Sequence, residues 1–408
     1  MPLREDKSRL TRRELLRVSM TAAVTTGASL LGCKAAAPKM RPPLPGIDVS
    51  GQHSLRFAAS GQGLLAGTAV AMQPLRHDPR YAQLLREQCS ILVAENAMKR
   101  GNLQPTSSAY FWDDADFLVA FAEEHRIKIR GHNFVWHEAI PKWLEAGINQ
   151  DNARQLMVEH IQTVASRYAG RIHSWDVVNE AIAPEQGRPD GMRMTPWLRY
   201  VGDDYLEVAY RTARQADPAA LLTYNEYGLD TESSYSEQRR AATLLLLRRL
   251  KARNVPIDAM GIQAHLTAGG ENRYGQGLQR FLMECRALNL QVFITELDVN
   301  DRALPGDQDA RDEGVAKTYR DYLSTVLPDS SVRAVLTWGL TDRGTWLNNK
   351  NARADKLPQR PLPFDADFQA KPAFAAMRDA FKNRSDRPAP AAPIQNYEPI
   401  RPGQRSSL

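Results

Sequence analysis

The feature that most constrains the fold of this chain is a regular alternation along residues 55–384. Short runs of β-branched and other apolar residues are separated by longer segments in which apolar residues recur at helical spacing. Strands that alternate with helices in this way form a parallel sheet whose two faces are both buried. Eight such repeats predict an α/β protein of the (β/α)8 TIM-barrel class, which carries its active site at the carboxyl ends of the strands.

The expected strands are residues 64–71, 91–95, 128–134, 174–178, 221–224, 259–263, 291–296 and 334–338. The expected helices include residues 112–125, 152–169, 204–216, 236–253, 278–288 and 312–327. In the segment 236–253, helical periodicity places Leu246, Leu247 and Leu250 on one face. We expect the arginines of this segment to lie largely away from that face: Arg239, Arg240, Arg248 and Arg249.

The charge balance gives no support for nucleic-acid binding. The formal net charge is +6, and residues 1–32 supply six basic and three acidic side chains, or 6 − 3 = +3 of it. The remainder of the chain has no run of five like charges and no basic stripe interleaved with aromatic residues. No stretch reaches the roughly 20 apolar residues of a spanning helix, which argues against a transporter or channel.

The first 33 residues have the character of a targeting segment. Residues 11–17, Thr-Arg-Arg-Glu-Leu-Leu-Arg, resemble a twin-arginine export motif, and a mildly apolar stretch follows over residues 18–32. Leu30-Leu31-Gly32-Cys33 resembles a bacterial lipobox, in which the cysteine becomes the lipid-bearing N-terminus. We therefore expect export to the periplasm or cell surface with a lipid anchor at Cys33. The alternative is an uncleaved amphipathic helix.

Proline-rich segments flank the expected barrel. Residues 34–54 read as a linker, residues 55–384 as the folded domain, and residues 385–408 as a disordered tail with little to bury. Cys89 and Cys285 have no metal-like spacing. We expect two separate buried thiols, although an oxidising compartment would also allow a disulfide.

Polar and aromatic side chains gather where the expected strands end. Because the carboxyl ends of barrel strands meet at one face, these groups predict a single polar cleft with aromatic walls. They are Glu95, Asn96 and Lys99; His132, Trp136 and His137; Asn179 and Glu180; Asn225 and Tyr227; Gln263 and His265; Glu296 and Asp298; and Trp338 and Trp346.

Glu180 and Glu296 are the candidate catalytic carboxylates. Glycoside hydrolysis needs one acid that protonates the leaving oxygen and one carboxylate on the other side of the anomeric carbon. Either glutamate alone would more often be a solvated loop acid, but two at strand ends beside amides and acids favour catalysis. The histidines show no His-x-His or His-Glu-x-x-His spacing, so hydrogen bonding is favoured over metal binding, and we expect neither a metal nor a cofactor.

The motifs at these strand ends closely resemble those of family 10 glycoside hydrolases, which are mainly endo-β-1,4-xylanases. They are Glu95-Asn96-x-x-Lys99, Arg130-Gly131-His132 to Trp136-His137, Trp175-Asp176-Val177-Val178-Asn179-Glu180-Ala181, Gln263-x-His265 and Ile294-Thr295-Glu296-Leu297-Asp298. The resemblance implies a retaining xylanase acting on xylan or related β-1,4-linked chains by double displacement, and we expect the protein to be a monomer. Glu180 would be the acid/base and Glu296 the nucleophile, with carboxyl groups about 5–5.5 Å apart.

The same resemblance implies roles for the surrounding residues. Asn179 would bond the sugar 2-hydroxyl, Gln263 would lie near the acid, and His265 would hold Glu296. Asp298 would fix the imidazole of His265. Other sugar hydroxyls would bind Glu95, Asn96, Lys99 and His132, sugar rings would stack on Trp136, Trp338 and Trp346, and the site would be supported by His137, Asn225 and Tyr227.

The chain departs from the family pattern at sugar-binding positions rather than at the catalytic pair. Ala139 stands where many members have Gln, Arg100-Gly101 where an aromatic residue is common, Gly228 where a second Asn is usual, and Glu226 where Asp is usual. These changes leave a related β-glycosidase acting on mixed glucans or short oligosaccharides as an alternative. A non-catalytic sugar-binding lipoprotein is a second alternative, against which the intact pair of glutamates argues.

Overall fold

The computed structural model describes residues 46–270 and 273–384. The predicted signal over residues 1–33 with its Cys33, the linker as far as residue 45, and the tail over residues 385–408 lie outside the described residues. Of the described helices, none is long and apolar enough to cross a membrane.

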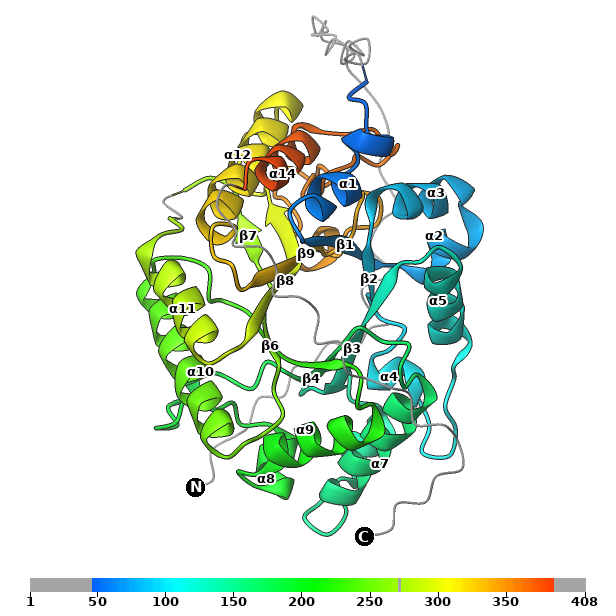
Figure 1. Cartoon of the computed structure of the whole chain (residues 1–408), viewed down its shortest axis with the longest axis vertical. Helices are drawn as coiled ribbons and strands as arrows, with labels where there is room; N and C mark the ends of the chain where they lie inside the picture. Colours follow the sequence, from blue (N-terminus) through cyan, green and yellow to red (C-terminus); the bar gives the residue numbers. More distant parts are fainter. Residues whose placement is uncertain (1–45, 271–272, 385–408) are drawn as a thin grey trace, which may run out of the picture. The chain divides into compact units, whose positions relative to one another are not determined.

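Parallel strands close into a barrel, which confirms the predicted (β/α)8 fold (Figure 1). The strands are β1 (Leu65–Val70), β2 (Ile91–Ala94), β3 (Lys128–Val135), β4 (Ser174–Asn179), β5 (Leu221–Glu226), β6 (Ala259–Ile262), β8 (Gln291–Asn300) and β9 (Val332–Thr337). Each pairs with its neighbour in chain order, β6 pairs with β8, and β9 returns to β1. The short strand β7 (His265–Thr267) pairs with the last residues of β8.

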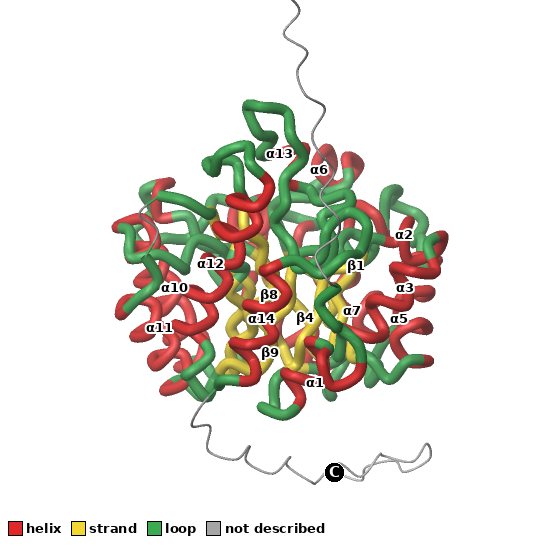
Figure 2. Tube along the Cα trace, turned by 90° about the horizontal axis from the view of Figure 1, so that it is seen from above, coloured by secondary structure: helices red, strands yellow, loops and turns green. Residues whose placement is uncertain are grey.

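Helices surround the barrel and the longer loops gather at one end of it (Figure 2). The α-helices are α1 (Leu55–Ser60), α2 (Met72–His77), α3 (Pro79–Gln88), α4 (Arg100–Leu103), α5 (Asp113–Glu124), α6 (Lys142–Gly147), α7 (Ala153–Arg167), α8 (Pro196–Val201), α9 (Tyr205–Ala216), α10 (Ser234–Ala252), α11 (Gln276–Ala287), α12 (Gln308–Val326), α13 (Leu347–Lys350) and α14 (Pro372–Lys382). Two 3-10 helices, η1 (Gly51–His53) and η2 (Pro184–Gln186), complete the set.

The interior of the barrel is a packed apolar cluster that leads up to the cleft. Its buried members are Ala69, Ile91, Val93, Ala259, Phe293, Ala334, Leu336 and Trp338. Trp346 packs against the same cluster from above β9. Two of the three tryptophans predicted to face sugar, Trp338 and Trp346, therefore pack on the barrel core, which restrains their rings.

One glycine allows β3 and β4 to pack closely. A Cβ on Gly131 would lie 1.9 Å from Cε3 of Trp175, a distance that no side chain tolerates. The indole of Trp175 stacks on Phe134 with ring centroids 4.4 Å apart, and its Nε1 donates to Asp217 Oδ2 at 2.9 Å. Gly131 is therefore required by the fixed position of this ring.

The predicted strands and helices correspond to observed elements, and the differences lie at their ends. The strand expected over 291–296 continues to Asn300, since β7 provides a partner for its last residues. The expectation for Arg239 and Arg240 was wrong, because both side chains are buried. Each finds carbonyl acceptors, as Arg239 binds Ile182 O and Arg240 binds Leu229 O. Cys89 and Cys285 are separate buried thiols, as expected.

Candidate active site

Glu180 follows the last residue of β4 and points into the cleft. Its carboxylate accepts hydrogen bonds from Trp136 Nε1 at 2.9 Å, from Gln263 Nε2 at 2.9 Å and from Asn179 Nδ2 at 3.2 Å. Burial raises the pKa of Glu180 to about 7, and the negative charge of Glu226 adds to this effect against the bonds from Gln263 and Trp136. Glu180 can therefore hold a proton near neutral pH, as a general acid requires.

Glu296 lies within β8 and is 5% exposed. Its Oε1 accepts from Asn225 Nδ2 at 2.8 Å, and its Oε2 lies 3.3 Å from His265 Nε2. Burial alone would raise the pKa of Glu296, but the hydrogen bond from His265 and the attraction of His132 and His265 lower it to about 2. Glu296 is therefore ionised where Glu180 is protonated.

Two asparagines connect these carboxyl groups. Asn225 Nδ2 donates both to Glu296 Oε1 and to Asn179 Oδ1, each at 2.8 Å. Thr295 Oγ1 donates to Asn225 Oδ1 at 2.7 Å, which fixes the orientation of this amide. Asn179 Nδ2 then reaches Glu180, so the two carboxylates share one continuous hydrogen-bonded chain.

A histidine between two carboxylates lies behind Glu296. His265 Nδ1 lies 2.9 Å from Asp298 Oδ1, and Trp346 Nε1 donates to Asp298 Oδ2 at 2.7 Å. Burial opposes the charged form of His265, but Asp298 and Glu296 outweigh it and hold the pKa of His265 well above its ordinary value. The imidazolium donates to both carboxylates, which keeps Glu296 unprotonated and oriented.

The residues after β2 form a polar row beside two tryptophans. Lys99 Nζ donates to Asn96 Oδ1 at 3.0 Å, and Asn96 Nδ2 donates to Glu95 Oε1 at 3.3 Å. Lys99 Nζ lies 5.3 Å from the ring centroid of Trp136 and 5.5 Å from that of Trp338. Burial lowers the pKa of Lys99 and raises that of Glu95. The row offers both donors and acceptors next to flat apolar faces, as sugar binding requires.

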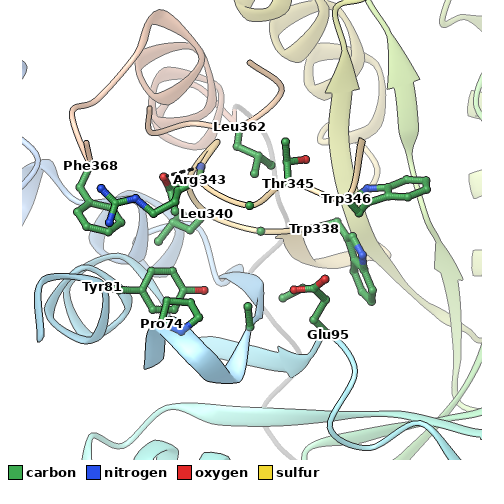
Figure 3. A pocket seen from close by; sticks show the side chains of 15 residues that line it. Pro74, Tyr81, Glu95, Trp338, Leu340, Arg343, Thr345, Trp346, Leu362 and Phe368 are labelled. Atoms are coloured by element: carbon green, nitrogen blue, oxygen red, sulfur yellow. Dashed lines mark hydrogen bonds between the residues drawn. The ribbon is translucent and has the colours of Figure 1, made fainter. Parts of the chain in front are cut away.

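A pocket continues from this row (Figure 3). Its lining includes Glu95, Trp338 and Trp346 together with Tyr81 and Arg343. In Figure 3 the carboxylate of Glu95 lies beside the indole of Trp338. Glu95 and Trp338 therefore belong both to the polar row and to this pocket.

His132 on β3 is held by a carboxylate that the sequence analysis had not assigned. Its Nδ1 lies 2.8 Å from Asp176 Oδ2, and Arg130 forms an ion pair with the other oxygen of Asp176. The ring of His132 stands nearly perpendicular to Trp338, with centroids 5.3 Å apart. The signal for Asp176 was present in the sequence, since a charged residue within a strand buried on both faces requires a buried partner.

Two predicted supporting residues lie at the margin of the site. His137 Nε2 is 4.0 Å from Glu180 Oε2, and burial lowers the pKa of His137 to about 4. Tyr227 makes no direct bond to either carboxylate. Its hydroxyl accepts from Arg193 at 2.8 Å, and Arg193 Nε donates to the backbone carbonyl of Glu180 at 2.8 Å. Arg193 was not predicted, because it lies in a loop without a recognisable motif.

Among the side chains that the structure describes, no group of three or more His, Cys, Asp or Glu residues is arranged to hold a metal ion. The predicted site residues gather around two carboxyl groups, of which Glu180 has a raised pKa and Glu296 a lowered one. Trp136, Trp338 and Trp346 lie beside them in the same network of contacts. A model described as glycosyl hydrolase family 10 matches residues 54–380 of this chain. The chain belongs to this family.

Members of family 10 resemble this chain over most of the barrel. Endo-1,4-beta-xylanase C of Paenibacillus barcinonensis is 33% identical over 342 residues, which cover 78% of this chain and 31% of that protein. This chain therefore spans about a third of the length of that relative. The thermostable celloxylanase of Thermoclostridium stercorarium is 34% identical over 347 residues, covering 77% of this chain and 85% of that protein.

The family fold is also seen in solved structures. Xylanase 10B of Thermotoga petrophila RKU-1, in complex with xylobiose, superposes with a TM-score of 0.72 at 29% sequence identity. The superposition covers 81% of this chain and 97% of that chain. The family 10 match over residues 54–380 therefore covers the barrel and both candidate carboxylates.

Proposed function

We propose that this protein is a retaining endo-β-1,4-xylanase in which Glu180 is the acid/base and Glu296 the nucleophile. The observation that carries the proposal is the opposite ionisation of two carboxyl groups in one hydrogen-bonded cleft. The pKa of Glu180 is raised to about 7 and that of Glu296 is lowered to about 2. A proton donor and an unprotonated nucleophile are therefore available at the same pH.

The proposed reaction has two steps. In the first, Glu296 attacks the anomeric carbon while Glu180 donates its proton to the glycosidic oxygen, so the bond to the leaving sugar breaks. In the second, Glu180 takes a proton from water, the water oxygen attacks the same carbon, and the ester bond to Glu296 breaks. Both groups return to their starting states, and the configuration at the anomeric carbon is retained.

Xylan is the proposed substrate because of the names of the similar proteins and because of the polar row formed by Glu95, Asn96 and Lys99. Two similar family members are named xylanase, and one of them was solved with xylobiose. Glu95, Asn96 and Lys99 supply donors and acceptors for sugar hydroxyls, and Trp338 adds an apolar face beside them.

The test is hydrolysis of xylan and of defined xylo-oligosaccharides, with the anomer of the product followed by NMR. The β-anomer should form first, and Glu296→Ala should lower kcat by several orders of magnitude. The matched control is Glu124→Ala, which removes an exposed glutamate at the end of α5 and should leave the rate unchanged. Binding of xylan without cleavage by the wild type would instead support a sugar-binding protein.

Selectivity for xylose over glucose is a separate proposal that rests on Ala139. This residue is exposed, with a φ of 51°, and a Cβ on Gly101 would lie 2.8 Å from its carbonyl oxygen. Gly101 therefore allows the loop at Ala139 to pack closely against α4. A short side chain at position 139 would leave room for a substituent on the adjacent sugar, and one relative is named a celloxylanase.

Rates on xylan and on carboxymethyl cellulose test this idea. Comparable rates would support a widened sugar site, and Ala139→Gln should then lower the cellulose rate more than the xylan rate. A strict preference of the wild type for xylan would contradict it.

The N-terminal segment supports a proposal about location. We propose that the protein is exported through its twin-arginine motif, Arg12-Arg13, and anchored by lipid at Cys33. Mass spectrometry of the mature protein should find an acylated N-terminal cysteine. An unmodified Met1 would contradict this proposal.

A further inference from the structure

Every backbone amide and carbonyl of residues 180–182, the segment that carries Glu180, takes part in a hydrogen bond. The amide of Glu180 donates to Asn225 O at 2.9 Å, the amide of Ala181 to the Tyr224 hydroxyl at 3.1 Å, and the amide of Ile182 to Glu226 Oε2 at 3.0 Å. The carbonyl of Glu180 accepts from Arg193 Nε at 2.8 Å, and the carbonyl of Ala181 accepts from the Arg193 amide at 2.7 Å. The carbonyl of Ile182 accepts from a guanidinium nitrogen of Arg239 at 2.9 Å.

This restraint coincides with an unfavourable backbone conformation. Glu180 has a φ of 58°, in the left-handed region that residues other than glycine rarely occupy. Such a conformation persists only where the surrounding structure determines it strongly. The bonds to residues 181 and 182 therefore set where the Glu180 carboxyl points.

Glu226 and Arg239 form the buried centre of this restraint. Both side chains are 0% exposed, so neither can touch the substrate, and the expectation that Glu226 stands at a sugar-binding position was wrong. A guanidinium nitrogen of Arg239 lies 2.7 Å from Glu226 Oε1, while the other carboxylate oxygen accepts from the Tyr224 hydroxyl and the Ile182 amide. Since the Tyr224 hydroxyl accepts from the Ala181 amide, its proton is directed at Glu226.

Glu226 is surrounded by hydrogen-bond donors. Besides Arg239, the Tyr224 hydroxyl and the Ile182 amide, it accepts from the Tyr227 amide at 3.1 Å. Burial raises the pKa of Glu226, and Arg239 together with these bonds opposes that rise. A protonated carboxyl would direct its own proton at a donor, so the arrangement fits the ionised form.

We propose that Glu226 and Arg239 are positioning residues for the acid/base, acting through the backbone of residues 181 and 182 and through the negative charge that Glu226 holds at the Ile182 amide. The inference rests on the proposed function. It assigns two tasks to Glu226: its length reaches the Ile182 amide, and its charge keeps the proton on Glu180.

The electrostatic task of Glu226 has to be compared with the effects of the other charged groups around Glu180. The charged or titratable side chains that face it are Glu226 from β5, Glu296 from β8, His137 after β3, Arg193 from the loop after η2, and Lys99 after β2. After burial, Glu226 makes the largest contribution to the raised pKa of Glu180. Removing its charge should therefore lower that pKa.

Two variants of one residue separate the tasks. Glu226→Gln keeps the reach and removes the charge, whereas Glu226→Asp keeps the charge and shortens the side chain by one methylene. The measurements are the pH profile of kcat on an aryl xylobioside and the titration of the Glu180 carboxyl by ¹³C NMR with labelled glutamate. The NMR titration does not depend on turnover.

For Glu226→Gln, the basic limb of kcat and the NMR titration of Glu180 should both move to lower pH by roughly one unit. For Glu226→Asp, the basic limb should stay in place while kcat falls about tenfold, because the acid is misplaced. An unmoved Glu180 titration in Glu226→Gln would overturn the electrostatic task. Full activity of Glu226→Asp would overturn the positioning task.

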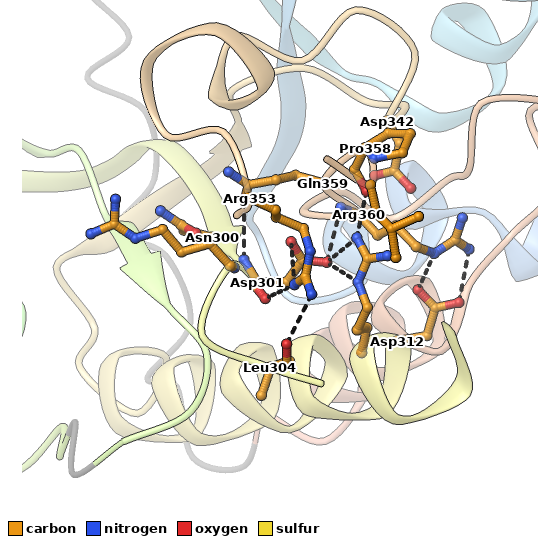
Figure 4. A network of polar contacts seen from close by, with 12 residues as sticks. Asn300, Asp301, Leu304, Asp312, Asp342, Arg353, Pro358, Gln359 and Arg360 are labelled. Carbon is orange, nitrogen blue, oxygen red and sulfur yellow. Dashed lines mark hydrogen bonds and ion pairs between the residues drawn. The ribbon is translucent and has the colours of Figure 1, made fainter. Parts of the chain in front are cut away.

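A buried ion pair elsewhere provides the control. Asp312 on α12 binds Arg360 through both oxygens, at 2.7 and 2.8 Å, in a network distant in sequence from Glu180 (Figure 4). Asp312→Asn should lower the melting temperature but leave the pH profile unchanged. If Asp312→Asn also moves the basic limb, general destabilisation explains the effect and the proposal fails. A wild type that hydrolyses no xyloside would refute the proposed function itself, whatever the titration of Glu180.

Discussion

Replacing Asp298 by Asn should weaken the proposed nucleophile, Glu296, without direct contact between the two side chains. Asp298 serves two donors with its two oxygens, His265 Nδ1 at 2.9 Å and Trp346 Nε1 at 2.7 Å. An asparagine has one acceptor oxygen, so either the histidine or the tryptophan would face an amide donor. The variant would also remove one of the two negative charges that keep His265 protonated.

The magnitude follows from the pKa of Glu296. Its fall from 4.5 to about 2 corresponds to about 3 kcal/mol in favour of the ionised form. His265 supplies the leading hydrogen bond and part of the attraction behind that fall. If a neutral His265 forfeits roughly half of the effect, the pKa of Glu296 rises by about one unit. We expect kcat to fall between about 10-fold and 100-fold, as for other residues that orient a catalytic group.

The assay is the pH profile of kcat/KM on an aryl xylobioside for Asp298→Asn and for Trp346→Phe. Only Asp298→Asn removes a charge, so only this variant should move the acid limb of the pH profile to higher pH. Trp346→Phe removes the indole N–H that donates to Asp298 Oδ2 and should leave the acid limb in place. An acid limb of Asp298→Asn that coincides with that of the wild type, with kcat within twofold, would refute the reasoning about His265.

Three further outcomes are expected. The wild-type rate should fall as pH rises through about 7, because Glu180 must be protonated to donate; a basic limb above pH 9 would contradict the assignment. Glu180→Ala should slow the hydrolysis of substrates with poor leaving groups far more than that of a dinitrophenyl xylobioside. Azide should restore turnover of the dinitrophenyl substrate, with a glycosyl azide as product. Equal losses of rate on both kinds of substrate would argue against an acid role for Glu180. Gly131→Ala should destabilise the fold by about 3 kcal/mol or more in urea unfolding, since its Cβ would overlap Trp175; a loss under 1 kcal/mol would show that the ring moves freely.

The sequence predicted the barrel because parallel strands buried on both faces leave a strong pattern. Apolar runs such as Gln291-Val292-Phe293-Ile294 between amphipathic segments are compatible with few other folds. Strand ends were less certain, since they depend on partners far along the chain. The extension of β8 to Asn300 follows from its pairing with β7. Because β7 is only three residues long, the sequence pattern does not predict it.

The cleft itself was predictable to the extent that its residues follow strands. Glu180 directly follows β4, His265 comes soon after β6, and Glu296 lies just beyond the part of β8 that pairs with β6, so the barrel brings these residues together. Arg193 and Arg239 could not be found in this way. Arg193 lies in a loop. Arg239 lies on α10 and was expected away from the leucine face because it is charged; its burial depends on the carbonyl of Ile182 and on Glu226.

The most direct test of the account is the site of covalent labelling. A 2-deoxy-2-fluoro xylobioside with a dinitrophenyl leaving group slows the second step more than the first, so the glycosyl-enzyme accumulates. The intact mass should increase by one fluoroxylobiosyl group, and the peptide map should place it on Glu296. A label on Glu180, or inactivation without any added mass, would contradict the double displacement proposed for this cleft.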